Sequence, residues 1–377
     1  MADWSEFQGD LLVTIVKRVN LIEDYLNFGT VCKSWHSVAT KENFNSNLPR
    51  APWLMLAEDE NDNIHRKFYS LYNGMILEKS IPGAIGKRCM ERGGISLLHP
   101  FSGVEIKLPH QNTTERYRYN ETSEPWTFIR KAVLSANPSH TSDYILMVID
   151  GNLELLSFWR PGDLLWTRLK MPATNGHFSD VVYFKGNFYA VTYGGCVQVC
   201  DLTGSEPTEG NIIVHLTPWI DGRFYILESL GSLFVVAQCG IDLRLVRDDR
   251  ERIPLTLILG GDEEEDSFPY TYGTREFHVF QIDLDSRGIT PIRDLGDRAF
   301  FLGDNASLSV QASQFPGIRP NHIYFTDNCL GAYLQFEEGG GLDMGVFNLA
   351  DGSIQPHYDG VSLSRVCPPI WVTPNPC

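Results

Sequence analysis

The first forty residues carry apolar side chains at intervals of three and four, which is the spacing of an amphipathic helix. One such run covers residues 10–19. After a break at residues 20–22, a second run covers residues 25–38, behind two acidic residues that are suited to cap a helix. The pattern therefore predicts two helices within residues 4–44.

This helical segment is too small to bury its own apolar side chains. A chain of about 40 residues rarely encloses a core by itself, and the apolar residues here outnumber what one short helix pair can hide. We therefore expect another surface to cover them. That surface comes either from the rest of the chain or from another protein.

From Pro52 onward the pattern changes to short β-rich runs separated by Gly, Pro, Asn and Asp. Pro49 and Pro52 discourage continuation of a helix into this part. We expect one all-β unit over residues 52–370, with no helix longer than three turns inside residues 140–350 and with residues 4–44 as a separate helical appendage. The predicted strands are Tyr144–Ile149, Leu153–Trp159, Val181–Phe184, Phe188–Tyr193, Val197–Asp201, Leu233–Ala237, Phe277–Leu284 and His322–Thr326.

A degenerate repeat runs through the β-rich part. An apolar strand ends in a polar–apolar pair and turns at a glycine, as at Asp201-Leu202 before Gly204 and at Asp283-Leu284 before Gly288. A separation of 283 − 201 = 82 residues equals about two propeller blades of ~40–45 residues each. Roughly 320 residues of strand need a closed or radial arrangement, since a flat sheet of that size leaves long exposed edges. The spacing favours a β-propeller of six or seven blades, with a double β-sandwich as the alternative.

Charge and hydropathy limit the partners. The chain has 377 residues and a formal net charge of −16 at pH 7, an excess that repels nucleic-acid phosphates and anionic membranes. Apolar runs such as Pro254–Leu259 are far shorter than the ~18 residues of a membrane-spanning helix. The acidic start lacks the basic region of a signal peptide. We expect a protein of the nucleus or cytoplasm that binds neither nucleic acid nor membrane.

Motifs for catalysis, metal binding or cofactor binding are absent from the sequence. There is no GxSxG, HExxH, phosphate-loop or GxGxxG motif, and the eight cysteines show no zinc-ligand spacing. The acidic run Asp262–Asp266 could bind a cation or a basic partner, although such runs are usually solvated loops. We therefore predict no catalytic residue, no metal, no cofactor and, in a reducing compartment, no disulfide.

The helical segment resembles an F-box, a helical motif that docks on Skp1-like adaptors in cullin-based ubiquitin ligases. The resemblance rests on Asp10-Leu11-Leu12 followed by Val31-Cys32-Lys33-Ser34-Trp35. The usual Leu-Pro before the first helix is Phe7-Gln8 here, which removes a preset helix start. The resemblance implies a Skp1-binding surface made of Phe7, Leu11, Leu12, Ile15, Val16, Leu26, Val31, Cys32 and Trp35.

The β-rich part resembles the KIB-type β-propeller that is common in plant F-box proteins. The resemblance is carried by Leu295–Gly303, Phe315-Pro316-Gly317 and Asn321–Asp327, and Gly345–Ile354 is similar to the C-terminal blade of that domain. It favours a kelch-like propeller over a sandwich. It also implies four segments: an F-box in residues 1–45, a linker in residues 46–51, a substrate-recognising propeller in residues 52–370 and a tail in residues 371–377.

These two resemblances imply a substrate-recognition subunit of an SCF-type (Skp1–cullin–F-box) E3 ubiquitin ligase. Such a protein binds a Skp1-like adaptor, and through it a cullin, and recruits a protein target without a catalytic site of its own. Two alternatives stay open at this point. The altered Phe7-Gln8 entry could have weakened Skp1 docking and left a non-ligase interaction scaffold. Paired carboxylates around a central channel could instead make a propeller enzyme such as a glycosidase.

Overall fold

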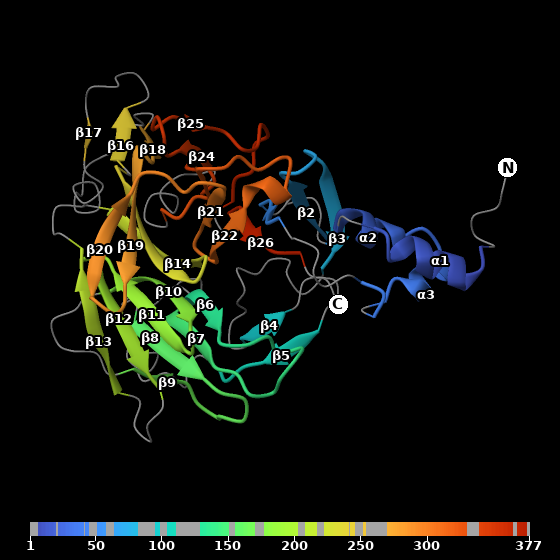
Figure 1. Ribbon diagram of the computed structural model, residues 1–377, viewed down its shortest axis with the longest axis horizontal. Helices are drawn as coiled ribbons and strands as arrows, with labels where there is room; N and C mark the ends of the chain where they lie inside the picture. Colours follow the sequence, from blue (N-terminus) through green and yellow to red (C-terminus); the bar gives the residue numbers. More distant parts are fainter. Residues whose placement is uncertain are drawn as a thin grey trace, which may run out of the picture.

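The computed structural model describes residues 7–19, 22–40, 42–44, 51–57, 64–81, 95–98, 104–110, 129–150, 155–169, 177–202, 208–216, 222–240, 242–245, 252–253, 270–329, 339–364 and 368–374. Within these ranges, helices near the N-terminus are followed by strands, with a short 3₁₀ turn at Ala312–Gln314. The helices project from one side of a body built of β-sheets (Figure 1). The mainly β fold with a small helical N-terminal part is confirmed.

The N-terminal segment forms three helices, where the sequence predicted two. They are α1 (Gly9–Val16), α2 (Ile22–Phe28) and α3 (Lys33–Val38). The second predicted helix is broken after Phe28, because Gly29 has a low helix propensity and the Thr30 hydroxyl donates to the Asn27 carbonyl at 2.7 Å. The His36 ring then holds the connection, with its Nδ1 3.0 Å from the Gly29 carbonyl oxygen.

The first sheet combines the two ends of the chain. Its strands, in spatial order, are β26 (Ile370–Val372), β1 (Trp53–Met55), β2 (His65–Ser70) and β3 (Ile76–Ser80). Because β26 pairs with β1, the β unit extends two residues past the boundary that we expected at residue 370. Trp371, which the sequence placed in a tail, is 1% exposed.

One face of the first sheet covers the helices. Trp53, Met55 and Phe68 of this sheet belong to the same buried cluster as seven residues of the helical segment: Leu12, Val16, Ile22, Tyr25, Phe28, Val38 and Phe44. The cover that the short helices need therefore comes from the chain itself, at least for this face. The helical segment shares its core with the first sheet and is not a separate appendage.

Four further sheets follow in chain order. The first contains β6 (Ile129–Leu134), β7 (Leu146–Asp150), β8 (Leu155–Trp159) and β9 (Thr167–Arg168). The second contains β10 (Phe178–Phe184), β11 (Asn187–Thr192), β12 (Cys196–Asp201) and β13 (Thr208–His215). The third contains β14 (Gly222–Ser229), β15 (Ser232–Cys239), β19 (Glu276–Asp283) and β20 (Gly288–Ile292). The last contains β22 (Ser307–Gln311), β21 (Arg298–Leu302), β23 (His322–Phe325), β24 (Gly345–Asn348) and β25 (Ile354–Gln355).

Most neighbouring strands are antiparallel and several join through tight turns. The turns Lys185-Gly186 and Leu230-Gly231 each contain two residues with positive φ, between 47° and 88°, as type I′ hairpins require. Glycine suits the second position because it has no Cβ to oppose that conformation. In the last sheet β21 and β23 pair in parallel. Each of the eight strands predicted from the sequence overlaps an observed strand.

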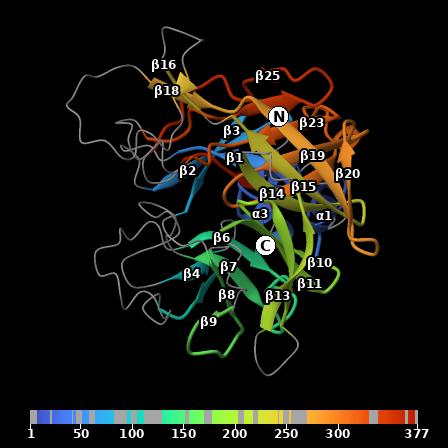
Figure 2. The same ribbon diagram turned by 90° about the vertical axis from the view of Figure 1, so that its left-hand side faces the viewer.

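The sheets are arranged around a common centre, as in a propeller. One edge strand of each sheet contacts that of the next: β6 contacts β10, β10 contacts β14, and β14 contacts β22. Figure 2 shows the sheets side by side around this centre. Trp371 of β26 joins the first sheet to the last, since its Nε1–H donates to the Leu302 carbonyl at 3.1 Å.

The number of large sheets differs from the expected six or seven blades. The described residues form five sheets of four or five strands. Two smaller sheets accompany them: β4 (Ser96–Leu98) with β5 (Glu105–Lys107), and β16 (Asp242–Leu245) with β17 (Arg252–Ile253) and β18 (Tyr270–Gly273). Leu98 packs against the first-sheet cluster, whereas Leu97 and Ile106 pack against the cluster of β7 and β8. The β4–β5 pair therefore lies between the first sheet and the β6–β9 sheet.

Candidate partner-binding surface on the helices

Helix α1 carries two apolar rows that lie about 100° apart around its axis. Leu12 and Val16, four residues apart, are 0% and 1% exposed and face the core. Leu11 and Ile15, also four apart, are 47% and 36% exposed. Residues at this spacing share one face of a helix, so α1 leaves an apolar row directed to solvent.

The start of α3 supplies the third exposed apolar side chain. Val31 is 57% exposed and precedes Cys32, the N-cap residue of α3. Trp35 on α3 is half-buried because its ring packs on Phe28 of α2, with ring centroids 4.3 Å apart. Phe28 itself belongs to the shared cluster with the first sheet, and so the tryptophan is held against the core.

The nine residues predicted to bind Skp1 fall into three groups of exposure. Leu11, Ile15 and Val31 are exposed, and among the described residues of the helical segment they are its exposed large apolar side chains. Phe7, Leu26, Cys32 and Trp35 are half-buried. Leu12 and Val16 are buried beneath α1. The structure thus presents some of the nine outward and places two of them in the core.

A tyrosine fixes the end of the helical segment. The Tyr25 hydroxyl on α2 donates to the Thr40 carbonyl at 2.5 Å, and its ring makes an edge contact with Phe44. Burial, with a smaller contribution from Glu42, raises the pKa of Tyr25 to about 12, so the phenol stays neutral and keeps its hydrogen bond. No sequence motif pointed to Tyr25, although it belongs to the second apolar run.

A buried polar network occupies the centre of the β-sheets. The Lys131 ammonium on β6 lies 2.6 Å from the Asp180 carboxylate on β10 and donates to Ser307 of β22 at 2.9 Å. The Ser307 hydroxyl in turn donates to Asp180 at 2.6 Å. Desolvation by burial lowers the pKa of Lys131, and the Asp180 charge opposes that shift. The network ties three sheets together.

A second carboxylate near this network is also engaged by cations. Asp304 pairs with Arg223 of β14 and lies 3.5 Å from Arg130 of β6. Asp180 and Asp304 are thus both held in contacts with cations across sheets. No sequence motif pointed to Lys131 or Asp180. The signal that the sequence offered was a charged residue next to consecutive apolar residues of a strand.

Three further features of the part of the chain that the structure describes concern metal binding, membrane spanning and thiol chemistry. There, no three His, Cys, Asp or Glu side chains are grouped to hold a metal ion. In the same ranges no helix has the length and apolar character to cross a membrane. The described cysteines, Cys32, Cys196, Cys200, Cys239 and Cys329, are free thiols, and burial raises the pKa of Cys200 to about 12. Cys89, Cys367, Cys377 and the acidic run Asp262–Asp266 lie outside the described residues.

The chain matches two domain families. An F-box domain matches residues 4–47, and the KIB1-4 beta-propeller matches residues 66–348. The first match covers the three helices, and the second covers the β-sheets from β2 to β24.

Relatives from Arabidopsis thaliana resemble the chain along most of its length. F-box protein At2g26160 is 22% identical over 86% of this chain and 96% of its own. Probable F-box protein At1g65740 is 25% identical over 90% of this chain and 94% of its own. F-box protein SKIP23 is 25% identical over 99% of this chain and 96% of its own.

Solved structures give a more distant likeness. YCF48 from Cyanidioschyzon merolae has a TM-score of 0.26 and 15% identity, over 64% of this chain and 67% of its own. The family match, by contrast, spans three quarters of the chain and coincides with the sheets seen in the structure. The chain is therefore a plant F-box protein that belongs to the KIB1-4 beta-propeller family.

Proposed function

We propose that the chain is the substrate-recognition subunit of an SCF-type E3 ubiquitin ligase, in which the helices bind a Skp1-like adaptor and the propeller binds the target. One observation carries this proposal. The F-box helices are folded against the first sheet, and yet Leu11, Ile15 and Val31 stay exposed. F-box domains generally bind Skp1-like adaptors, and exposed apolar side chains beside a packed core are typical of a partner site.

The proposal assigns different parts to the nine predicted residues. Leu11, Ile15 and Val31 contact the adaptor directly, and Phe7, Leu26, Cys32 and Trp35 contribute their exposed edges. Leu12 and Val16 hold α1 on the first sheet and thereby orient the contacting row.

Phe7-Gln8 stands where F-boxes usually have Leu-Pro, and this difference raised the alternative of a non-ligase scaffold with weakened Skp1 docking. Helix α1 begins at Gly9 directly after Gln8, although Gln8 makes no side-chain capping bond. The helix therefore forms without a proline at its start, because packing of its buried row on the sheet supplies the stability. This supports adaptor binding over a scaffold with a degenerate F-box.

The chain would contribute positioning to ubiquitination. The adaptor and a cullin hold the ubiquitin-charged enzyme, and the propeller holds the target near it, which raises the effective concentration of an acceptor lysine. Asp180 and Asp304 support this view over a propeller glycosidase, because both carboxylates are paired with cations of neighbouring sheets. We further propose that β4–β5 belongs to a sixth blade and that the protein acts in the nucleus or cytoplasm.

Adaptor binding can be tested with purified proteins. The double substitution Leu11→Ala with Val31→Ala should weaken the affinity for a Skp1-type adaptor at least tenfold, because large apolar anchors dominate such interfaces and about 1.4 kcal/mol corresponds to tenfold. Isothermal titration calorimetry measures the affinity, and circular dichroism checks folding.

Leu164 and Leu165 provide the matched control. They are 86% and 57% exposed in the loop between β8 and β9, away from the helices. Their double alanine variant should bind the adaptor as the unchanged protein does. Equal affinity of the Leu11/Val31 variant and this control would refute the adaptor surface and the ligase role with it.

A further inference from the structure

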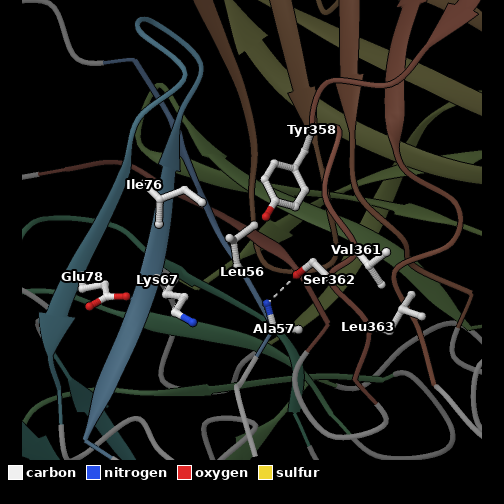
Figure 3. Close-up of a pocket in the computed structure, with 9 residues that line it drawn as sticks. All are labelled: Leu56, Ala57, Lys67, Ile76, Glu78, Tyr358, Val361, Ser362 and Leu363. Carbon is white, nitrogen blue, oxygen red and sulfur yellow. Dashed lines mark hydrogen bonds between the residues drawn. The ribbon is translucent and has the colours of Figure 1, made fainter. Parts of the chain in front are cut away.

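A groove with a volume of about 770 Å³ lies beside the first sheet. One side of it is formed by β2 and β3 together with the residue after β1, through Leu56, Lys67, Ile76 and Glu78. The segment that follows β25 forms the other side, including Val361. Figure 3 shows Lys67 and Glu78 side by side on their strands, across the groove from Val361. Volumes of roughly 300–1,000 Å³ are typical of ligand sites.

The segment on the far side of the groove is fixed in place. The Ala57 amide donates to the Ser362 hydroxyl at 2.9 Å, and Ser364 pairs with Gly340 in an isolated β-bridge. Gly341 permits this close approach, because a Cβ there would lie 2.2 Å from the Ser362 carbonyl oxygen and its φ is +121°. Val361 nevertheless remains 85% exposed. An anchored segment that holds an apolar side chain in solvent is preorganised for binding.

The opposite side of the groove ends in an open sheet edge. In the described residues β3 pairs with β2 and is the last strand of its sheet. The Ser70 amide donates to the Met75 carbonyl at 2.9 Å, and the Ile81 amide donates to the Ile64 carbonyl at 3.2 Å. Odd-numbered positions of β3 therefore face β2, since inward and outward main-chain groups alternate in an antiparallel pair. The N–H and C=O groups of the even-numbered positions 76, 78 and 80 point to the free edge.

Positions 76 and 78 of β3 direct their main-chain groups to the sheet edge and their side chains to the groove. Ile76 is 46% exposed and Glu78 is also exposed, and both line the groove. A strand that pairs with this edge places every second side chain on the groove face. Ile76 and Glu78 lie two positions apart on β3. An added strand therefore meets them with an apolar and a charged side chain that are also two positions apart.

The charges around the groove indicate the sign of the charge on the ligand side chain that faces Glu78. Glu78 on β3 and Asp359 beside the far wall are both exposed. Lys67 lies next to Glu78, opposite it in the strand register. The whole chain carries a net charge of −16. Two exposed carboxylates on an acidic protein favour a basic ligand over an acidic one.

We propose that this groove recognises the ubiquitination target by binding one of its extended segments, which adds to β3 as a further strand and carries an apolar and a basic side chain two positions apart, on the same face. The apolar side chain lies between Ile76 and Val361, and a lysine or arginine faces Glu78 and Asp359. The inference rests on the proposed function for the identity of the ligand as a target. It assigns the recognition surface to the sheet that also carries the F-box helices on its other face.

Designed peptides test the groove without knowledge of the target. The probe is a fluorescein-labelled ten-residue peptide in which every second residue is threonine and the positions between alternate valine with lysine, so that one strand face carries both. Its binding is measured by fluorescence anisotropy in 150 mM salt, a concentration at which general attraction between charges is screened beyond about 8 Å. It should bind at least tenfold more tightly than the same peptide with glutamate in place of lysine, and than a peptide of the same composition whose valines and lysines lie on opposite strand faces. Equal binding of all three, or no binding of the first, would overturn the proposal.

Two variants locate the binding. Glu78→Pro removes an outward-facing N–H and leaves the pairing with β2 intact, and it should weaken peptide binding at least tenfold. The matched control is Ile354→Pro, at an outward-facing position of the edge strand β25, since the Asn348 amide pairs with Ser353. That control should bind normally.

A side-chain variant keeps the test decisive if Glu78→Pro impairs folding. Val361→Lys changes an 85% exposed residue on the far wall and should also weaken the valine–lysine peptide at least tenfold. Unchanged binding in Val361→Lys would exclude the groove. All variants should retain adaptor binding. A variant that loses peptide binding and keeps adaptor binding tests the groove alone. A variant that keeps peptide binding and loses adaptor binding tests the ligase role alone.

Discussion

His357 shows how a single residue of the chain is shaped by burial. It is 8% exposed, and its Nε2–H donates to the Phe325 carbonyl at 3.0 Å, which requires the neutral tautomer with the proton on Nε2. Its ring lies 5.2 Å from that of Trp371. In the described structure its Nδ1 is buried without a hydrogen-bond partner. Desolvation by burial therefore lowers the pKa of His357 to about 4.

This shift predicts a pH dependence of stability. Between pH 6.5 and about 4 the unfolded histidine binds a proton and the folded one does not, so the free energy of unfolding falls as the pH is lowered. The contribution is complete above pH 6.5, and its loss reaches about 3 kcal/mol near pH 4, at about 1.4 kcal/mol per pKa unit.

The variant His357→Gln isolates this effect, because glutamine keeps a donor for Phe325 and does not titrate. Urea unfolding at pH 7.5, 5.5 and 4.5 should show the unchanged protein losing stability relative to the variant as the pH falls. Parallel pH profiles for the two proteins would contradict the assignment of the low pKa to His357.

At the scale of elements, the first sheet connects two surfaces. Its Trp53, Met55 and Phe68 pack on the F-box helices, whereas Leu54, Leu56 and Tyr69 pack toward the last sheet, next to the groove. Neighbouring positions of a strand point to opposite faces, so one four-stranded sheet contacts both the helices and the last sheet. The position of α1 then depends on its buried row and not on its exposed row.

Adjacent leucines of α1 test this dependence. Leu12→Ala deletes a side chain that is 0% exposed and should lower the free energy of unfolding by about 2–5 kcal/mol. Leu11→Ala, at a 47% exposed position, should change stability by less than about 0.5 kcal/mol. Thermal unfolding followed by circular dichroism measures both. Similar losses in the two variants would show that the burial assigned to α1 is wrong.

At the scale of the whole molecule, the chain closes its ring of sheets through its C-terminal strand. β26 pairs with β1, and Trp371 packs against Phe301 with ring centroids 5.0 Å apart. The Asn305 side-chain amide also donates to the Trp371 carbonyl at 2.5 Å. Because this strand is hydrogen-bonded to both the first and the last sheet, its loss should lower the stability of the whole molecule.

Trp371→Ala should therefore lower the free energy of unfolding by about 3–5 kcal/mol, since it removes a large buried side chain and one of the two N–H donors, with the Thr326 amide, to the Leu302 carbonyl. Trp371→Phe keeps an aromatic ring and should lose less. Urea denaturation of both variants gives the comparison. A loss below about 1 kcal/mol in the alanine variant would mean that β26 does not hold the ring closed.

The sequence by itself determined the secondary-structure class and the family. The change from helical to alternating periodicity after residue 44, the turn residues and the two motif sets are local signals, and each can be read from a few consecutive residues. The eight predicted strands were confirmed for this reason. The break between α2 and α3 was missed, because the apolar spacing continued across Gly29 while the backbone did not.

Only the tertiary structure decided which residues of the motif are exposed and where the surfaces lie. Leu11 and Leu12 are alike in sequence, and their opposite burial depends on Phe68 and Trp53 of a distant sheet. The groove depends on a hydrogen bond between Ala57 and Ser362, which are 305 residues apart. Contacts of this range leave no periodic trace in the sequence, since the positions involved are brought together by the closure of the ring and not by their local pattern.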